Sequence, residues 1–331
     1  MQWNSTKMQS LAACLAIAAA AVVFLSGVVF GRASKQPLWF TRPAQPQPSA
    51  ESQAYYKALS TVPASWGNTK SSPGHSALSR LATIWRNCSQ GIYLDIGTNL
   101  GVQIRKLYDP WQFPGAKVLG LYNATYGGHN RSGVCALGVE ANPVHTPYLN
   151  TLNAFFARKG YQALVLTGTA ASIRAGKVTF YLDHDSPVEW GASLTKGAWQ
   201  RNGNTTVNKA SIAALNLPAF VADIIRPLLL EIQQETGRRP PAGMKLDVEG
   251  AEYALLPALI TNGGLCDLSM VYMEAHTEEF RETNGKAVNM SIAAMDEAFE
   301  HMRRANPKCT VNYTHLDDET HRLGYKIPLP L

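Results

Sequence analysis

The sequence predicts an α/β fold in which helices cover both faces of a mostly parallel sheet, preceded by one transmembrane helix. From Gly91 onward, short apolar runs alternate with longer helical patterns, which is typical of βαβ units around a parallel sheet. Residues 76–331 are long enough to form one large domain with a well-buried core. The uncharged stretch from Met8 to Gly31 indicates the membrane helix.

The N-terminal region divides into a tail, an anchor and a stem. Residues 1–8 form the tail, and the 24 uncharged residues that begin at Met8 contain the predicted signal anchor, residues 9–31. At about 1.5 Å per residue, this stretch can cross a hydrocarbon core about 30 Å thick. A cleaved signal peptide is the alternative, but its apolar region is usually about 7–15 residues long. Residues 32–75 include a proline-rich, aperiodic stretch and form an extended stem.

The membrane orientation rests on signals that conflict. One basic residue precedes the span and three follow it closely, which by the positive-inside rule favours a cytosolic C-terminal side. Glycosylation sequons after the span favour the lumenal side instead. These sequons begin at Asn87, Asn123, Asn130, Asn204, Asn289 and Asn312. We expect a type II, single-pass protein with a lumenal domain.

The cysteines support that orientation. Cys14 lies in the anchor, which leaves an even set of four, as expected for two disulfides in an oxidising compartment. The four are Cys88, Cys135, Cys266 and Cys309, and their pairing stays open. Four buried thiols in a cytosolic protein are the alternative.

Strands and helices alternate through the predicted domain. The expected strands are Ile92–Ile96, Ala136–Glu140, Ala163–Thr167, Lys177–Leu182, Met244–Val248 and Met270–Glu274. The expected helices are Ala77–Trp85, Thr146–Lys159, Ala251–Asn262 and Ile212–Thr236, the last interrupted at Pro218 and Pro227. Cys309–Leu316 is expected to form one half of a closing antiparallel hairpin.

The net charge gives no support to nucleic-acid binding. Of the formal charge of +6, four basic residues lie between Met1 and Ala50 with no acidic residue among them, which leaves +2 for the rest of the chain. The predicted domain has no basic stripe interleaved with aromatic residues, so we expect no nucleic-acid partner.

The turn after the first strand predicts a cofactor site. It reads Asp95-Ile-Gly97-Thr98-Asn99-Leu-Gly101, and ligands of open α/β sheets bind outside the carboxyl ends of the strands. Glycine lets a backbone turn sharply and approach a ligand. A dinucleotide site needs G-x-G-x-x-G, whereas this turn lacks the central glycine and suits a cofactor with an amino group and no phosphate. The alternative is a strand-to-helix turn that uses glycine only for geometry.

A second acidic motif follows the next strand. Glu140-Ala-Asn142-Pro143 places a carboxylate where it can accept both ribose hydroxyls of a nucleoside. We therefore predict cofactor contacts from Glu140 and Asn142. A capping acid before the following helix is the alternative, because Pro143 suits a first helical position.

The chain also resembles a known family. Lys245-Leu-Asp247-Val-Glu249-Gly250-Ala-Glu252 is similar to the K-x-D-x-E-G-x-E signature of FkbM-type methyltransferases. The resemblance runs from about Ile92 to Glu274 and includes the two cofactor motifs and a Gly-Ala-Ser-Leu segment. It implies a Rossmann-like class I methyltransferase fold with a mostly parallel seven-stranded sheet. It also implies S-adenosyl-L-methionine as cofactor and methyl transfer to hydroxyl groups of sugars or small natural products.

Methyl transfer to oxygen needs a group that removes the hydroxyl proton and an alignment of acceptor and donor. Asp247 ends the central strand and Glu249 lies two residues beyond it, so we predict that both point into the cleft as catalytic residues. Asp247 is also expected to contact the cofactor. A capping or turn role is the alternative for both. Glu252 is expected in the first turn of the next helix, where a carboxylate interacts favourably with the dipole.

The following strand ends in Tyr272-Met-Glu274-Ala-His276, which puts an acid and an imidazole on one face. His276 is a candidate catalytic base because its unperturbed pKa of about 6.5 lies near working pH, and a structural histidine is the alternative. These residues with Asp247 and Glu249 could gather around a divalent cation. Their spacing matches no standard metal motif, so no metal is predicted.

The adenine contact is assigned to Thr169 or to nearby backbone groups, because Thr167-Gly-Thr169-Ala-Ala-Ser172 lacks the acid or amide common at this place in related folds. Trp190 and Trp199 are candidates for stacking on a sugar, with a core or loop-anchoring role as the alternative.

The resemblance, the anchor and the sequons together imply a membrane-anchored O-methyltransferase in the Golgi lumen that acts on a sugar hydroxyl of a glycan, a glycoconjugate or another small hydroxyl acceptor. An NAD-type oxidoreductase is the alternative enzyme, disfavoured by the missing G-x-G-x-x-G motif. A catalytically inactive nucleoside- or glycan-binding domain is the non-enzymatic alternative. The oligomeric state stays open.

Overall fold

A computed structural model describes the chain at residues 85, 88–128, 130–183, 189, 191–195, 208–276 and 291–318. The predicted tail, anchor and stem, residues 1–75, lie outside the described residues, as does the helix expected at Ala77–Trp85 apart from its last residue. Among the helices in the described ranges, none is long and apolar enough to cross a membrane.

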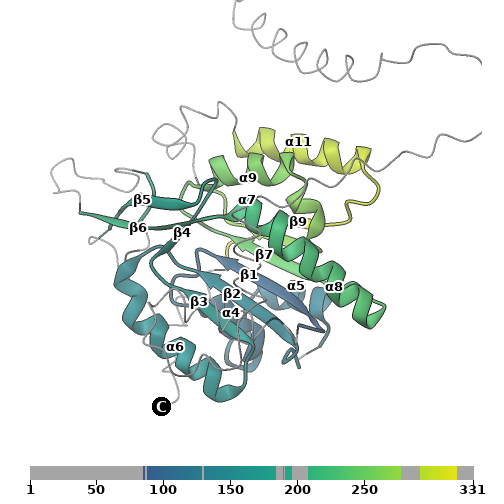
Figure 1. Ribbon diagram of the computed structural model, residues 1–331, viewed down its shortest axis with the longest axis horizontal. Helices are drawn as coiled ribbons and strands as arrows, with labels where there is room; N and C mark the ends of the chain where they lie inside the picture. The colour runs from purple at the N-terminus through teal and green to yellow at the C-terminus, as the bar shows by residue number, and fades with distance from the viewer. Residues whose placement is uncertain are drawn as a thin grey trace, which may run out of the picture. The chain divides into compact units, whose positions relative to one another are not determined.

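Six strands form the main sheet, in the order β3-β2-β1-β7-β8-β9 (Figure 1). Every neighbouring pair in this sheet is parallel. The strands are β1 (Gly91–Ile96), β2 (Val134–Val139), β3 (Ala163–Leu166), β7 (Ala242–Leu246), β8 (Met270–Met273) and β9 (Asn312–His315). The predicted parallel α/β sheet is confirmed, and five of the six predicted strands lie in it.

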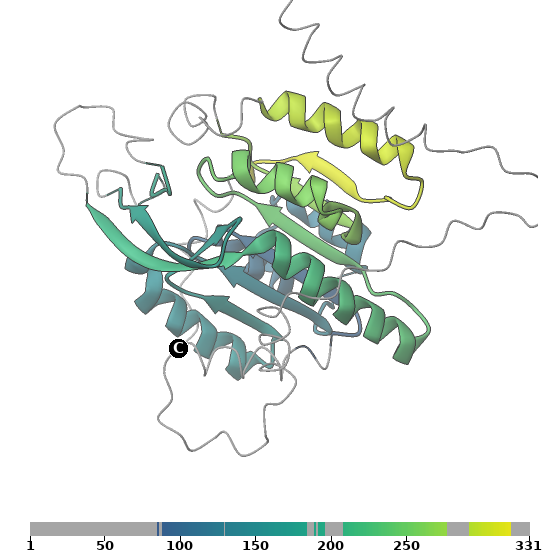
Figure 2. The same cartoon turned by 45° about the horizontal axis from the view of Figure 1, so that its top comes forward.

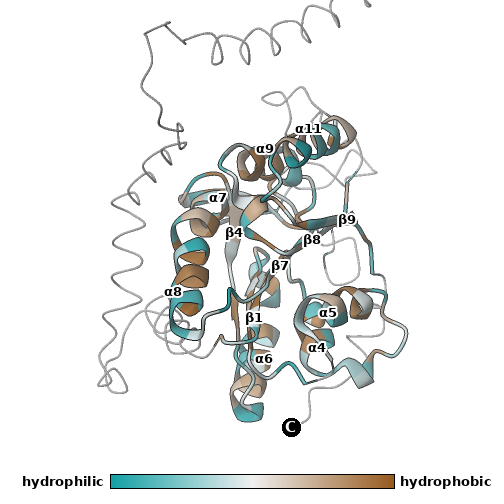
Figure 3. Ribbon diagram, turned by 90° about the vertical axis from the view of Figure 1, so that its right-hand side faces the viewer, coloured by the Kyte–Doolittle hydropathy of each residue, from teal (hydrophilic) through white to brown (hydrophobic). Residues whose placement is uncertain are grey.

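Apolar residues cover both faces of the sheet, because successive side chains of a strand point to opposite faces. On β1, Leu94 joins one buried cluster, with residues of α7 (Leu217–Phe220), α8 (Arg226–Thr236), α9 (Glu252–Thr261) and α11 (Ile292–Ala305). Its neighbour Tyr93 joins the other cluster, with residues of α4 (Val102–Tyr108), α5 (Val118–Tyr126) and α6 (Thr146–Lys159). Figure 3 shows α8 on one side of β1, and α4 and α5 on the other.

The C-terminal strand pairs in parallel with its described neighbour. β9 confirms a strand within Cys309–Leu316 and runs parallel to β8, with Met270 opposite Asn312, and no antiparallel partner of β9 is among the described residues. The reason for the parallel pairing is α11, which connects the two strands as a crossover helix, and a parallel pair requires such a connection. Ser291 begins α11 by accepting a hydrogen bond from the Ala294 N–H at 3.2 Å. The sheet therefore has six strands rather than seven within the described residues.

The helix expected over Ile212–Thr236 begins later than predicted. Its first residues belong to β6 (Lys209–Asn216), whose burial alternates in part with the two-residue period of a strand. Asn216 then caps α7, because its side chain accepts a hydrogen bond from the Ala219 N–H at 3.2 Å. A π-helical turn, η5 (Val221–Ile225), separates α7 from α8. Pro218 and Pro227, the predicted interruptions, lie in the first turns of α7 and α8, where a missing N–H is tolerated.

A second sheet has three strands in the order β4-β6-β5 (Figure 2). It contains β4 (Thr169–Ser172) and β5 (Gly176–Tyr181) beside β6. The strand predicted at Lys177–Leu182 is confirmed as β5, but it pairs antiparallel with β6 and lies outside the parallel sheet. β4 follows β3 after two residues, so the small sheet begins beside the carboxyl end of β3.

Two disulfides confirm the expectation from the even cysteine set. Cys88 pairs with Cys135 and joins the segment before β1 to β2. Cys266, in the short 3-10 helix η6 (Gly264–Asp267), pairs with Cys309 just before β9.

Candidate functional site

The turn after β1 lies at the point where the order of the strands in the sheet reverses. β1 pairs with β2 on one side and with β7 on the other, and ligands of open α/β sheets bind at such a point. Gly97 and Gly101 have φ values of +77° and +73°, which glycine adopts readily. A Cβ on Gly97 would overlap the carbonyl oxygen of Asp247, and one on Gly101 would overlap Leu152. Glycine is therefore required at both positions by conformation and by space.

Glu140 joins this turn to the end of β2. Its Oε2 accepts a hydrogen bond from the Asn99 N–H at 2.6 Å, and its Oε1 accepts one from the Asn142 N–H at 2.7 Å. Asn142 caps the next helical turn, η3 (Pro143–His145). Its Oδ1 accepts a hydrogen bond from the Val144 N–H at 3.0 Å. Glu140 is thus not the capping acid that the sequence left as an alternative.

Asp95 lies beneath the turn, fully buried. Its Oδ2 accepts a hydrogen bond from the Thr98 hydroxyl, and its Oδ1 lies 3.9 Å from Lys245 Nζ. Burial raises the pKa of Asp95 to about 6, although Lys245 and Thr98 both lower it. The carboxylate does not line the cavity described below, so Asp95 supports the turn from behind.

Lys245 is a site residue that the sequence analysis missed. It lies on β7 with Nζ 2.7 Å from Asp247 Oδ2 and donates a hydrogen bond to the Gly97 carbonyl at 2.8 Å. Burial lowers the pKa of Lys245, but the carboxylates of Asp247 and Asp95 outweigh it and raise the pKa above its ordinary value. Two signals in the sequence could have identified it: its place as the lysine of the K-x-D-x-E-G-x-E pattern, and the rarity of a lysine within a buried strand.

A cavity of about 570 Å³, open mouth included, lies where these loops meet. The predicted site residues that line it are Gly97, Asn99, Glu140, Asn142, Thr169, Asp247 and Glu249. Asp95, Thr98, Gly101 and His276 are not among its lining residues. Phe180, Ala192 and Leu194 add apolar surface from β5 and from the segment Gly191–Thr195.

The described lining of this cavity is acidic. Its charged side chains are the carboxylates of Glu140, Glu189, Asp247 and Glu249, and no lysine or arginine of the described residues joins them. Glu189, which the sequence analysis did not single out, accepts a hydrogen bond from Asn142 Nδ2 at 2.8 Å. The cavity therefore suits a ligand with positive charge.

The Gly-Ala-Ser segment lies against the loop after β7. The Ser193 hydroxyl donates a hydrogen bond to the Glu249 carbonyl at 2.6 Å and accepts one from the Thr195 N–H at 2.9 Å. Thr169 lies at the start of β4, and its N–H donates to the Glu140 carbonyl at 2.9 Å. Trp190 and Trp199, the candidates for sugar stacking, lie outside the described residues.

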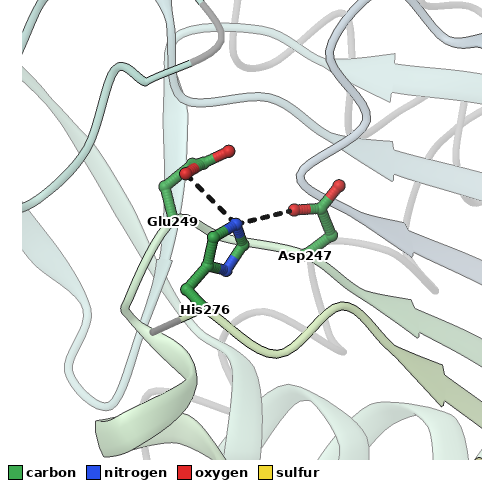
Figure 4. A group of neighbouring side chains, drawn as sticks. All are labelled: Asp247, Glu249 and His276. Atoms are coloured by element: carbon green, nitrogen blue, oxygen red, sulfur yellow. Dashed lines mark ion pairs between the residues drawn. The ribbon is translucent and has the colours of Figure 1, made fainter. Parts of the chain in front are cut away.

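Beside the cavity, acidic side chains surround His276 (Figure 4). Its Nε2 lies 3.1 Å from Glu249 Oε2, 3.8 Å from Asp247 Oδ1 and 3.9 Å from Glu274 Oε1. Its Nδ1 lies 2.9 Å from Oε1 of Glu252. The structure thus brings the three predicted catalytic residues together at the ends of β7 and β8.

Glu252 begins α9, as predicted, but it does more than face the helix dipole. It is fully buried, and its two oxygens accept hydrogen bonds from the Val248 and Gly250 N–H groups, each at 2.8 Å. The carboxylate thereby fixes the loop that carries Glu249, whose φ is +51°, and orients the ring of His276.

The surrounding charges set the protonation of this cluster. Burial by itself lowers the pKa of His276, but the Glu252 and Glu249 carboxylates raise it to about 12. In this arrangement His276 is an imidazolium at neutral pH and donates hydrogen bonds to its acidic neighbours. Burial, followed by the charge of Asp247, raises the pKa of Glu274 to about 8.

Comparisons with known proteins do not assign the chain to a family. No protein-family model matches the chain, and no curated protein matches it. The chemistry of the site therefore rests on the contacts described above.

Proposed function

We propose that this chain is an S-adenosyl-L-methionine-dependent O-methyltransferase of the FkbM type that methylates a sugar hydroxyl of a glycan or glycoconjugate in the secretory pathway. The observation that carries the proposal is the acidic cavity at the carboxyl ends of the strands, beside β1, where the strand order reverses. Four carboxylates line it, from Glu140, Glu189, Asp247 and Glu249.

Charge favours this cofactor over a dinucleotide. S-adenosylmethionine has a sulfonium and an ammonium group, whereas the pyrophosphate of a dinucleotide is anionic. A cleft lined by one sign of charge concentrates ligands of the opposite sign. A phosphate in this cavity would lie beside carboxylates and would find no lysine or arginine among the described lining residues, so the lining disfavours a pyrophosphate.

Particular residues can recognise the nucleoside. Each Glu140 oxygen accepts one backbone N–H, and His145 Nδ1 lies 3.5 Å from Oε1. A carboxylate offers about four lone-pair sites, so Glu140 can still accept hydrogen bonds from ribose hydroxyls. We assign the charged end of the cofactor to Asp247 and to the backbone of Gly97 and Asn99, which line the cavity. We assign the adenine to Thr169 and Phe180, which also line it.

The chemistry needs a proton acceptor near the methyl donor. When bound, the cofactor supplies a methyl group for in-line displacement by the acceptor oxygen. Asp247 and Glu249 line the cavity and can accept the hydroxyl proton, which completes the transfer. His276 holds both carboxylates in place.

The proposal also covers location and partners. The 24 uncharged residues from Met8 to Gly31 would anchor a type II protein, and the two disulfides suit an oxidising lumen. We place the enzyme in the Golgi, with a glycan or small-molecule hydroxyl as acceptor.

A second candidate is an NAD-type oxidoreductase, and the sheet favours it. Counted along the chain, the strands of the main sheet run third, second, first, fourth, fifth, sixth, which is the order of the dinucleotide-binding doubly wound fold. The turn Asp95–Gly101 lacks the glycine that admits a pyrophosphate. We therefore rank this candidate second.

Calorimetry decides between the two cofactors. The full chain, purified in detergent, is titrated separately with S-adenosylmethionine and with NAD. We expect heat of binding with S-adenosylmethionine alone and a weaker affinity in Glu140→Gln. The control is Glu300→Gln, a partly exposed carboxylate on α11 that pairs with Arg303. Binding of NAD but not of S-adenosylmethionine would refute the proposal.

The acceptor is identified by transfer of a labelled methyl group to a panel of glycans. We expect a labelled glycan with the wild-type chain and none with Asp247→Asn. A chain that binds S-adenosylmethionine yet labels no hydroxyl acceptor would instead be a binding domain.

A further inference from the structure

Asp247, Glu249 and His276 have the donor atoms and the spacing of a divalent-cation site. Two carboxylates and one imidazole bring ligand atoms within 4.8 Å of one another. His276 Nε2 lies 3.1 Å from Glu249 Oε2 and 3.8 Å from Asp247 Oδ1. Two ligands that are each about 2.1 Å from one ion lie about 3.0–3.4 Å apart at octahedral or tetrahedral angles. Small side-chain shifts, together with release of the Nε2 proton of His276 when the ion binds, would therefore complete the coordination.

The partner of the other ring nitrogen supports this assignment. A histidine that binds a metal almost always gives its second ring N–H to a carboxylate, carbonyl or water. Here Nδ1 of His276 lies 2.9 Å from Oε1 of Glu252, which is fully buried and is held by two backbone N–H groups. Glu252 is not one of the three ligands, yet its contact with Nδ1 fixes the ring. Figure 4 shows that Nε2 of His276 then faces Glu249 and Asp247.

We propose that Asp247, Glu249 and His276 bind one divalent cation and that Glu252 is the positioning residue behind the histidine. Carboxylates favour hard ions such as Mg²⁺ and Mn²⁺, whereas imidazole favours ions such as Zn²⁺ and Fe²⁺. A set with one nitrogen and two oxygen donors lies between these classes, and Mn²⁺ is the best match.

The cation site deepens the proposed methyltransferase function, and the role of the ion rests on that function. Asp247 and Glu249 line the cavity, so the open coordination positions of the ion face the space where an acceptor binds. An ion there would hold the acceptor hydroxyl and lower its pKa. Glu249 offers the ion one carboxylate oxygen, and its other oxygen can accept the hydroxyl proton. A sugar with two neighbouring hydroxyls fills two such positions, which makes vicinal diols the expected acceptor class.

The test measures Mn²⁺ binding without any cofactor. The full chain in detergent is treated with a chelator, dialysed and titrated with Mn²⁺, while electron paramagnetic resonance follows the signal of free aquated Mn²⁺. We expect one bound ion per chain. Glu249→Gln should abolish binding, and Glu252→Gln should weaken it about 10–100-fold, as typical of residues that orient a ligand. Glu300→Gln is the control and should bind as the wild type does.

Two results would overturn the cation site: no depletion of free Mn²⁺ by the wild-type chain, or equal depletion by Glu249→Gln. Circular dichroism checks that each variant folds, and His276→Gln replaces Glu249→Gln if the latter does not. The result of the Mn²⁺ titration does not depend on the result of the cofactor titration. Binding of S-adenosylmethionine without binding of Mn²⁺ removes only the cation site, and the reverse result removes only the methyltransferase proposal.

Discussion

Lys245 Nζ lies 2.7 Å from Asp247 Oδ2, at the carboxyl end of β7 beside β1. The same ammonium group donates a hydrogen bond to the Gly97 carbonyl and lies 3.9 Å from Asp95 Oδ1. One cation thus connects the turn after β1 with the acidic end of β7.

Lys245→Met should therefore damage both stability and cofactor binding. Removal of one partner of a buried ion pair typically costs about 3–5 kcal/mol, because the remaining charge is left buried. Denaturant unfolding should show a loss of that size, and calorimetry should show weaker S-adenosylmethionine binding. Lys308→Met changes an exposed lysine and should alter neither. Equal stability of the two variants would contradict the role of Lys245.

Asp95 should give the unfolding free energy a distinctive pH dependence. Its pKa is about 6 in the folded chain and about 3.9 in the unfolded chain. The folded state thus binds the proton more tightly, so this contribution to stability is fully present below about pH 4 and is lost as the pH rises through about 6.

Comparison with Asp95→Asn isolates this term, because asparagine does not titrate. From about pH 4 to about pH 7, the unfolding free energy of the wild type minus that of the variant should fall by on the order of 3 kcal/mol. Urea denaturation across this range, with chelator present, provides the measurement. A difference that does not vary with pH would show that the pKa of Asp95 is not raised by burial.

Gly97→Ala should destabilise the chain far more than an alanine at another glycine with positive φ. An added Cβ at Gly97 overlaps the Asp247 carbonyl, whereas one at Gly160, φ +69°, has nothing within 4 Å. The left-handed conformation costs roughly 1–2 kcal/mol in either variant, and overpacking at Gly97 adds about 1–3 kcal/mol. Thermal or urea unfolding of both variants tests this. Similar losses would mean that the turn after β1 can move away from β7.

The two disulfides should contribute similarly to stability. They close loops with sequence separations of 47 and 43 residues, for which chain entropy predicts about 4 kcal/mol each. Cys88→Ala with Cys135→Ala, and Cys266→Ala with Cys309→Ala, should lower the unfolding free energy by comparable amounts in denaturant titrations. A negligible loss from either pair would show that its bond is not formed in the folded protein.

Local patterns were enough to predict much of the main sheet and several of the residues that line the candidate site. The predicted strands around Leu94, Leu137 and Met244 are mostly apolar, as expected for strands buried on both faces, and only Asp95 and Lys245 interrupt β1 and β7. α6 has the predicted bounds, Thr146–Lys159. The glycines after β1 and the carboxylate after β2 were identifiable because their spacing reflects constraints within a few residues of chain.

Other features depend on partners that are distant in sequence. Ile212–Asn216 reads as part of a helix, yet it pairs with β5 and β4 and becomes a strand, since tertiary pairing overrides a weak local pattern. Asp95 appeared to be a ligand contact, but it meets Lys245, 150 residues later, beneath the turn. Glu252 was expected to serve a helix terminus, and folding of β8 beside β7 brings His276 to it. These contacts arise from sheet order and packing, which no local periodicity encodes.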